Sequence, residues 1–139
     1  MVQLVVGKKG KGKTRHLLGK ANAEILGVHG NIVYLDKNTK HMYELNNKIR
    51  LINVMEYHIT DEKEFMGFIK GIISQDHDLE QMYFDSFLTI GSVNEEDIEE
   101  AVNKLEKIGK KFNIKFFLSC AVDESDLPES LRDKILISL

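Results

Sequence analysis

Eight residues near the N-terminus have the types and the spacing of a phosphate-binding loop. Residues 7–14 read Gly-Lys-Lys-Gly-Lys-Gly-Lys-Thr and match the pattern G-x-x-x-x-G-K-[ST]. The glycines let the backbone curl so that its N–H groups point at phosphate oxygens, and a helix that begins directly afterwards adds partial positive charge. In this pattern the lysine, here Lys13, reaches the β- and γ-phosphates, and the hydroxyl of Thr14 binds Mg²⁺. The loop therefore predicts a site for a nucleotide and Mg²⁺.

Two acidic residues at the ends of predicted strands are candidates to complete this site. Asp85 follows the apolar run Met82-Tyr83-Phe84 and is predicted to bind Mg²⁺ together with Thr14. Asp36 ends a neighbouring strand and is the rival for contact with the metal or its water. Ligands of open α/β sheets bind at the carboxyl ends of the strands, where both acids would lie. Lys13, Asp36 and Asp85 are the predicted catalytic residues, and the predicted nucleotide-binding residues are Gly7, Lys8, Lys9, Gly10, Lys11, Gly12, Lys13, Thr14 and Arg15.

Apolar, β-branched runs alternate with amphipathic segments along the chain, and this order positions the candidate residues. Strands are predicted at Val2–Val6, Asn31–Asp36, Arg50–Val54, Met82–Asp85, Ile114–Ser119 and Ile135–Ile137. Helices are predicted from about Lys13 to Leu26 with Gly27 as C-cap, after the capping pair Asp61 and Glu64, and after the N-cap Asn94, with a helical turn at Pro128–Arg132. Residues 37–49 are ambiguous between a helical turn and an edge strand. The alternation favours an α/β fold, a three-layer α/β/α sandwich with a mostly parallel central sheet, as a single domain over residues 1–139.

Composition and charge narrow the functional classes. The net charge is −3, but residues 1–50 hold 10 Lys and Arg against 3 Asp and Glu, while residues 51–139 hold 9 against 19. A basic first third favours an anionic ligand or partner there. The single cysteine, Cys120, cannot form an internal disulfide, and no apolar run approaches the roughly 20 residues of a membrane span. Because the first residues also lack the features of a signal peptide, we expect a cytoplasmic protein without a membrane partner.

On these residues the chain resembles the P-loop NTPases and, within them, the core of the RecA-like ATPases. The resemblance covers nearly the whole chain and is carried by the loop at residues 7–14, the strands Asn31–Asp36 and Arg50–Val54, and the run Phe84-Asp85-Ser86. It implies a topology in which one other strand separates the strand before the loop from the strand before Asp85. It also implies ATP and Mg²⁺ as cofactors and a polar sensor at Ser119 and Cys120. The chain is also similar to short bacterial proteins that carry a twitching-motility ATPase label.

The chain departs from that family at the residue that activates water. RecA-like ATPases usually place a Glu just past the second strand, whereas this chain has Asp36-Lys37-Asn38-Thr39 there. Asp36, or Glu56 just past the third strand, is the candidate to replace it. We therefore expect an ATP-binding P-loop protein that is a slow or partner-activated Mg²⁺-dependent ATPase. Two alternatives stay open: a nucleotide-sensing module that does not hydrolyse ATP, and a small kinase that transfers the γ-phosphate to another acceptor.

Further contacts and partners have less support in the sequence. His16, just past the loop, is a candidate for contact with the nucleotide, and Arg132 is a candidate arginine finger supplied to a neighbouring subunit. RecA-like domains often act as homo-oligomers, so a second copy of the chain is one candidate partner. Nucleic acid has weak support, because the total charge is negative and no stripe of arginine and aromatic residues is present. ATP is favoured over GTP because the chain lacks an Asn/Thr-Lys-x-Asp motif for guanine.

Overall fold

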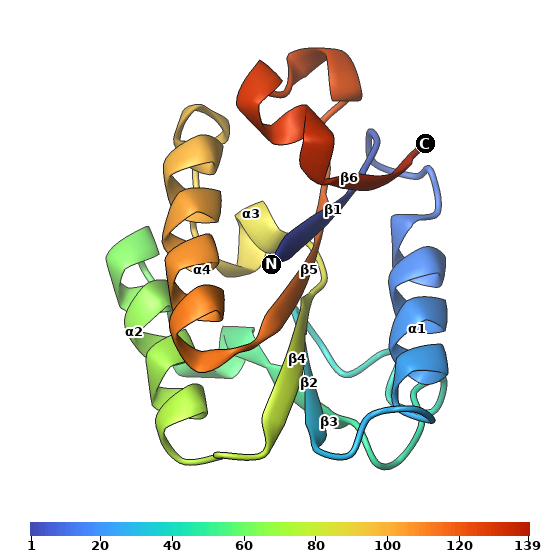
Figure 1. The fold of residues 1–139 in the computed structure, drawn as a ribbon. Helices are drawn as coiled ribbons and strands as arrows, with labels where there is room; N and C mark the ends of the chain where they lie inside the picture. The colour runs from blue at the N-terminus through green and yellow to red at the C-terminus, as the bar shows by residue number, and fades with distance from the viewer.

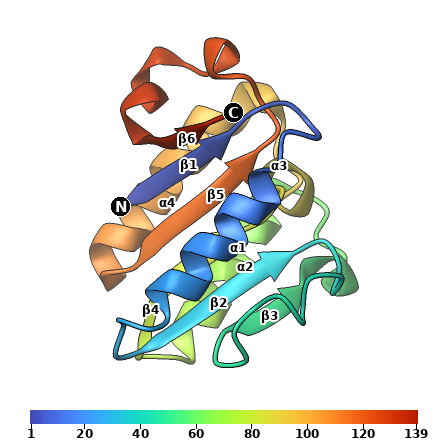
Figure 2. The same ribbon diagram turned by 90° about the vertical axis from the view of Figure 1, so that its right-hand side faces the viewer.

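One six-stranded sheet, in which every neighbouring pair of strands runs parallel, forms the centre of the fold (Figure 1). The computed structural model describes all residues from Met1 to Leu139. The strands are β1 (Val2–Val6), β2 (Asn31–Asp36), β3 (Arg50–Asn53), β4 (Leu79–Phe84), β5 (Lys115–Cys120) and β6 (Ile135–Ser138). They lie in the order β3-β2-β4-β5-β1-β6, so β5 separates β1 from β4 (Figure 2). Because all strands point the same way, their carboxyl ends meet at one edge of the sheet.

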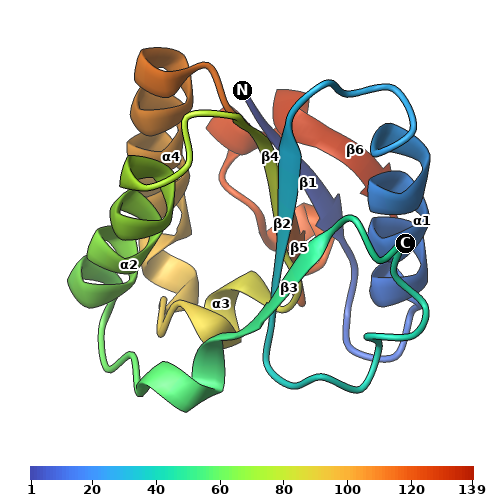
Figure 3. The ribbon, with the colours of Figure 1, turned by 90° about the horizontal axis from the view of Figure 1, so that it is seen from below.

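Helices cover both faces of the sheet. On one face packs α1 (Lys13–Glu24), and on the other lie α2 (Glu62–Ser74), α3 (Phe87–Ile90) and α4 (Ile98–Phe112) (Figures 1 and 3). Short 3₁₀ turns occur at η1 (Val54–Tyr57), η2 (Glu95–Asp97), η3 (Glu124–Asp126) and η4 (Glu129–Lys134). None of the helices has the length and apolar character that crossing a membrane requires. The predicted α/β class, with a parallel sheet flanked by helices, is confirmed.

Side-chain alternation along the strands divides the core into two layers. In β2, Ile32 and Tyr34 belong to the layer under α1, whereas Val33 and Leu35 belong to the layer under α2 and α4. This is the period of two that a strand buried on both faces must show. The layer under α1 contains 11 buried residues and the opposite layer contains 29, so most of the apolar burial lies on the side away from α1.

The two long helices behind the sheet form as their sequences predict. The carboxylate of Asp61 accepts a hydrogen bond from the backbone N–H of Glu64 at 2.8 Å, which caps α2. Both helices bury a stripe of apolar residues with the helical period: Phe65, Met66, Ile69, Ile72 and Ile73 in α2, and Ile98, Ala101, Val102, Leu105 and Ile108 in α4. Lys110 and Lys111 lie in the last turn of α4, where cations offset the helix dipole.

Three local predictions are wrong or incomplete, each for a backbone reason. α1 is capped by Ile25 instead of Gly27, because the chain leaves the helix without the left-handed backbone angle that favours glycine. Asn94 caps the 3₁₀ turn η2, in which Asp97 donates its N–H to the Asn94 carbonyl at 2.9 Å, and α4 begins only behind it. Residues 37–49 form turns without a helix or strand, and their Leu45 and Ile49 pack into the layer under α1.

Candidate functional site

The phosphate-binding pattern forms a loop between the end of β1 and the start of α1. Gly10 and Gly12 have backbone φ angles of 86° and 89°, in the left-handed region that side chains with a Cβ rarely adopt. Gly12 is the N-cap of α1, so the loop leads directly into the helix N-terminus. The backbone N–H groups of Lys9, Gly10 and Gly12 donate no hydrogen bond within the protein. They are therefore free to bind an anion, which the N-terminus of α1 would also attract.

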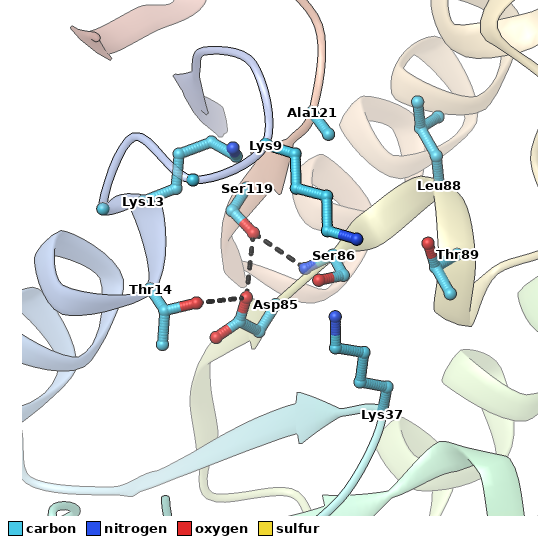
Figure 4. A pocket seen from close by; sticks show the side chains of 12 residues that line it. Lys9, Lys13, Thr14, Lys37, Asp85, Ser86, Leu88, Thr89, Ser119 and Ala121 are labelled. Atoms are coloured by element: carbon cyan, nitrogen blue, oxygen red, sulfur yellow. Dashed lines mark hydrogen bonds between the residues drawn. The ribbon is translucent and has the colours of Figure 1, made fainter.

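A cavity of about 350 Å³ lies between this loop and α3 (Figure 4). It is lined by Lys9, Gly10, Gly12, Lys13, Thr14, Lys37, Asp85, Ser86, Leu88, Thr89, Ser119 and Ala121. The structure thus brings Lys13, Thr14 and Asp85 together with three further residues of the predicted loop. Gly7, Lys8, Lys11, Arg15 and Asp36 do not line this cavity.

Thr14 and Asp85 are in direct contact although they are 71 residues apart in the sequence. The Thr14 hydroxyl donates to Asp85 Oδ1 at 3.1 Å, and the Ser119 hydroxyl donates to the same oxygen at 3.2 Å. Ser119 in turn accepts the backbone N–H of Ser86 at 2.7 Å (Figure 4). Asp85 is only 3% exposed, so its carboxylate is held by hydrogen bonds in place of water. A hydroxyl and a carboxylate are oxygen donors of the kind that Mg²⁺ takes, and the pair fits such an ion.

Lysines surround this cavity. Lys13 Nζ donates to the carbonyl oxygen of Lys8 at 2.9 Å, while Lys9 and Lys37 extend their ammonium groups into the cavity from opposite sides (Figure 4). Partial burial lowers the pKa of Lys13 below its ordinary value, and attraction to Asp85 opposes that shift. Because Asp85 is the only acidic side chain in the lining, the cavity is positively charged and suits a polyanion.

Asp36, unlike Asp85, does not line the cavity. Its side chain is 2% exposed, with Oδ1 accepting the backbone N–H of Lys37 at 2.7 Å and Oδ2 without any partner. Burial raises the pKa of Asp36, and repulsion from Asp85 adds to the shift. Asp36 is thus buried without lining the cavity, and Asp85 is the only carboxylate that the cavity exposes to a ligand.

The remaining candidates lie around the site. Lys11, Arg15 and His16 line a second cavity of about 560 Å³, which shares Gly12 and Thr14 with the first. Arg132 on η4 and Glu56 on η1 are exposed side chains outside both cavities.

The two predicted sensor residues have different surroundings. Ser119 contacts Asp85, whereas Cys120 is fully buried in the layer under α2 and α4. Burial raises the pKa of the Cys120 thiol to about 12, so the thiol stays protonated and unreactive at neutral pH.

Tyr34 is a site residue that the sequence reasoning missed. It is fully buried in β2, and its hydroxyl donates to Asp85 Oδ2 at 2.8 Å. A signal for it exists in the sequence, because a tyrosine inside an apolar strand needs a hydrogen-bond partner and Tyr34 shares a face with Asp36 two residues later. Lys37, Ser86 and Thr89 are further lining residues that were not predicted.

No protein-family model matches the chain. No group of three or more His, Cys, Asp or Glu side chains is placed to hold a metal ion by itself. A metal at this site would therefore need ligands beyond the protein carboxylates, such as a hydroxyl, phosphate oxygens and water.

Proposed function

We propose that this protein binds ATP with Mg²⁺ and hydrolyses it slowly or when a partner activates it. One observation carries the proposal. The hydroxyl of Thr14, the last residue of the loop motif, contacts the buried carboxylate of Asp85, and both side chains line a cavity surrounded by lysines. The loop motif requires a strand before it and a helix after it, and β1 and α1 supply both. A surface loop without a ligand would not need a buried carboxylate at its helical end.

The strand order supports membership of the P-loop NTPases. β5 lies between β1, which precedes the loop, and β4, which precedes Asp85, and this separation is the one that the RecA-like resemblance implies. The loop follows the carboxyl end of β1 and Asp85 follows that of β4, while Ser119 is the second-last residue of β5. All three therefore lie at the carboxyl edge of the sheet, where open α/β sheets bind their ligands.

The proposed roles follow from the positions of the side chains. The free N–H groups of the loop and the ammonium of Lys13 would hold the phosphates, and Thr14 and Asp85 would hold Mg²⁺. Mg²⁺ held there would neutralise negative charge on the phosphate oxygens. Lys9 and Lys37 would stabilise the negative charge on the oxygens of the transferred group, so catalysis would consist of positioning and electrostatic stabilisation.

A second function, nucleotide sensing without turnover, is favoured by the position of Asp36. This carboxylate is the candidate to orient the attacking water, yet it is buried and does not line the cavity. Asp85, the one carboxylate in the lining, would hold Mg²⁺. Without a second carboxylate to act as base, hydrolysis would be slow or absent until a partner supplies one. Both functions share the binding site and differ only in turnover.

Lys13→Ala, compared with Lys11→Ala, tests the binding site. Both lysines belong to the same loop, but only Lys13 lines the cavity, so we expect ATP affinity to fall at least tenfold in Lys13→Ala and to change little in Lys11→Ala. ATP affinity is measured by calorimetry, and phosphate release with Mg²⁺ is followed over a range of protein concentrations. An unchanged affinity in Lys13→Ala would contradict the site assignment.

The same samples separate the two functions. Phosphate release that requires Lys13 identifies an ATPase, and a steep rise with protein concentration identifies a site completed by a second subunit. Intact ATP recovered after long incubation with Mg²⁺ identifies the sensing module.

A further inference from the structure

The carboxylate of Asp85 is held at both of its oxygens. Oδ1 accepts hydrogen bonds from Thr14 and Ser119, at 3.1 and 3.2 Å. Oδ2 accepts the hydroxyl of Tyr34 at 2.8 Å, the shortest of the three contacts. The Tyr34 contact lies on the side of the carboxylate that faces the interior, because Tyr34 is fully buried and does not line the cavity.

The ring of Tyr34 has little freedom to move. β2 pairs with β4 so that Tyr34 lies opposite Tyr83, and the two rings are stacked at 6.0 Å with an angle of 11°. Tyr83 stacks in turn on Phe117 of β5 at 4.6 Å. An ionised carboxylate can only accept hydrogen bonds, so the Tyr34 hydroxyl is the donor in this contact.

We infer that Tyr34 is a positioning residue of the metal site: it anchors Asp85 Oδ2 in the interior, so that Oδ1 stays beside the hydroxyl of Thr14. This inference rests on the proposed function, in which Thr14 and Asp85 hold Mg²⁺. Without the tyrosine hydroxyl, Oδ2 would be buried and unpaired, and the carboxylate would gain freedom to rotate away from Thr14. Groups that orient a metal ligand typically change metal affinity by about 10- to 100-fold when they are removed.

Tyr83 provides a matched control. It is also fully buried, it lies in the same layer, and its hydroxyl also donates one hydrogen bond of 2.8 Å. Its acceptor, however, is Gln81 Oε1 and not Asp85. Tyr34→Phe and Tyr83→Phe therefore remove the same atom from equivalent packing, and only the first frees the Asp85 carboxylate.

The experiment measures ATP affinity of the full chain in EDTA and during a Mg²⁺ titration. We expect Tyr34→Phe to raise the Mg²⁺ concentration needed for half-maximal tightening of ATP binding by about tenfold, with affinity in EDTA unchanged. Tyr83→Phe should stay within about twofold of the wild type in both conditions. Because Tyr34 would act through Asp85, Tyr34→Phe should add nothing to the effect of Asp85→Asn in the double variant.

Other results would contradict either the role of Tyr34 or the proposed function. Equal Mg²⁺ shifts in Tyr34→Phe and Tyr83→Phe would assign the effect to general packing and overturn the positioning role. A weaker affinity of Tyr34→Phe in EDTA would overturn it too, because the hydroxyl would then act on the nucleotide without the metal. If ATP affinity were the same in the wild type and in Lys13→Ala, and the same with and without Mg²⁺, the proposed function itself would be overturned, and the role of Tyr34 with it.

Discussion

The two faces of the sheet differ in what they bury. The layer under α2 and α4 consists of 29 buried apolar residues, including a group of aromatic rings in which Phe65 contacts Phe84 and Phe87 edge-on. The layer under α1 has 11 buried apolar residues, and two of them are tyrosines. The molecule's four buried polar residues follow the strand alternation that faces α1; they are Asp36, Gln81, Asp85 and Ser119.

This difference indicates that one face of the sheet supplies most of the stability of the fold and the other holds the polar site. Apolar burial contributes about 25 cal/mol per Å², so the larger layer can supply most of the stabilising free energy without any polar group. Buried polar side chains are costly unless they are hydrogen-bonded. Three of the four under α1 bond to other side chains: Asp85 to Tyr34 and Ser119, and Gln81 to Tyr83. Asp36 is the exception, with Oδ2 unpaired. The α1 face can thus hold a charged site because the opposite face stabilises the fold.

The largest expected effect breaks the apolar layer. Phe65→Ala should lower the free energy of unfolding by about 3–5 kcal/mol, because the fully buried ring leaves a cavity beside Phe84 and Phe87. Urea unfolding measures the loss, and ATP affinity of the folded variant should stay near that of the wild type.

Leu17→Ala in α1 is the matched variant on the other face. Leu17 is also fully buried, so its removal should cost about 2–5 kcal/mol as well. It lies one turn after Thr14, and we expect ATP affinity to fall in this variant because α1 positions the loop and Thr14. If Phe65→Ala weakened ATP binding as much as Leu17→Ala, the division between the two faces would be wrong.

The elements of the apolar layer were the easiest to predict from the sequence. α2 and α4 have long apolar stripes with the helical period, and these stripes are buried in the structure. α3 was missed because its four residues, Phe87–Ile90, are too few to show a period. Its N-cap is Ser86, whose φ angle of 61° is uncommon for a residue other than glycine, and the amino-acid composition gives no sign of that turn.

The loop and the pairing of Thr14 with Asp85 were predicted from the sequence, whereas the contact of Tyr34 with Asp85 was missed. The loop at residues 7–14 is contiguous, so its residues carry a recognisable pattern. Tyr34 and Asp85 are 51 residues apart, and their contact depends on the pairing and register of β2 with β4. Alternation shows which side chains share a face, but not which strand lies next to which. The burial of Asp36 outside the cavity was unpredictable for the same reason.

The next expected effect concerns the charge of Asp36. Burial and Asp85 raise its pKa above the ordinary value of 3.8, so folding favours the protonated form. The stability that the protonated form contributes is therefore complete below about pH 4 and is lost as the pH rises through the raised pKa. Asp36→Asn should remove this loss and exceed the wild type in stability by about 1 kcal/mol at pH 7, because the neutral amide does not carry the cost of burying a charge.

Urea unfolding at pH 4 and pH 7 checks this expectation. The two proteins should have similar stability at pH 4, and the exposed Glu56→Gln should follow the wild type at both values. A variant that is less stable than the wild type at pH 7 would show that the α1 face is stabilised by the Asp36 charge, in conflict with its unpaired Oδ2. Phosphate release by Asp36→Asn also tests whether this carboxylate takes part in turnover.

The smallest expected effect is the difference between an exposed lysine that lines the cavity and a nearby exposed lysine that does not. Lys37 extends into the cavity, whereas Lys40, three residues later, does not line it (Figure 4). We expect Lys37→Gln to weaken ATP binding by about threefold at low salt, because an exposed ammonium interacts with phosphate through well-screened solvent. The difference from Lys40→Gln should disappear as the salt concentration rises in a binding titration. A loss in Lys37→Gln as large as that in Lys13→Ala, and insensitive to salt, would instead mean that Lys37 binds phosphate directly, and the site on the α1 face would then extend from the loop to the end of β2.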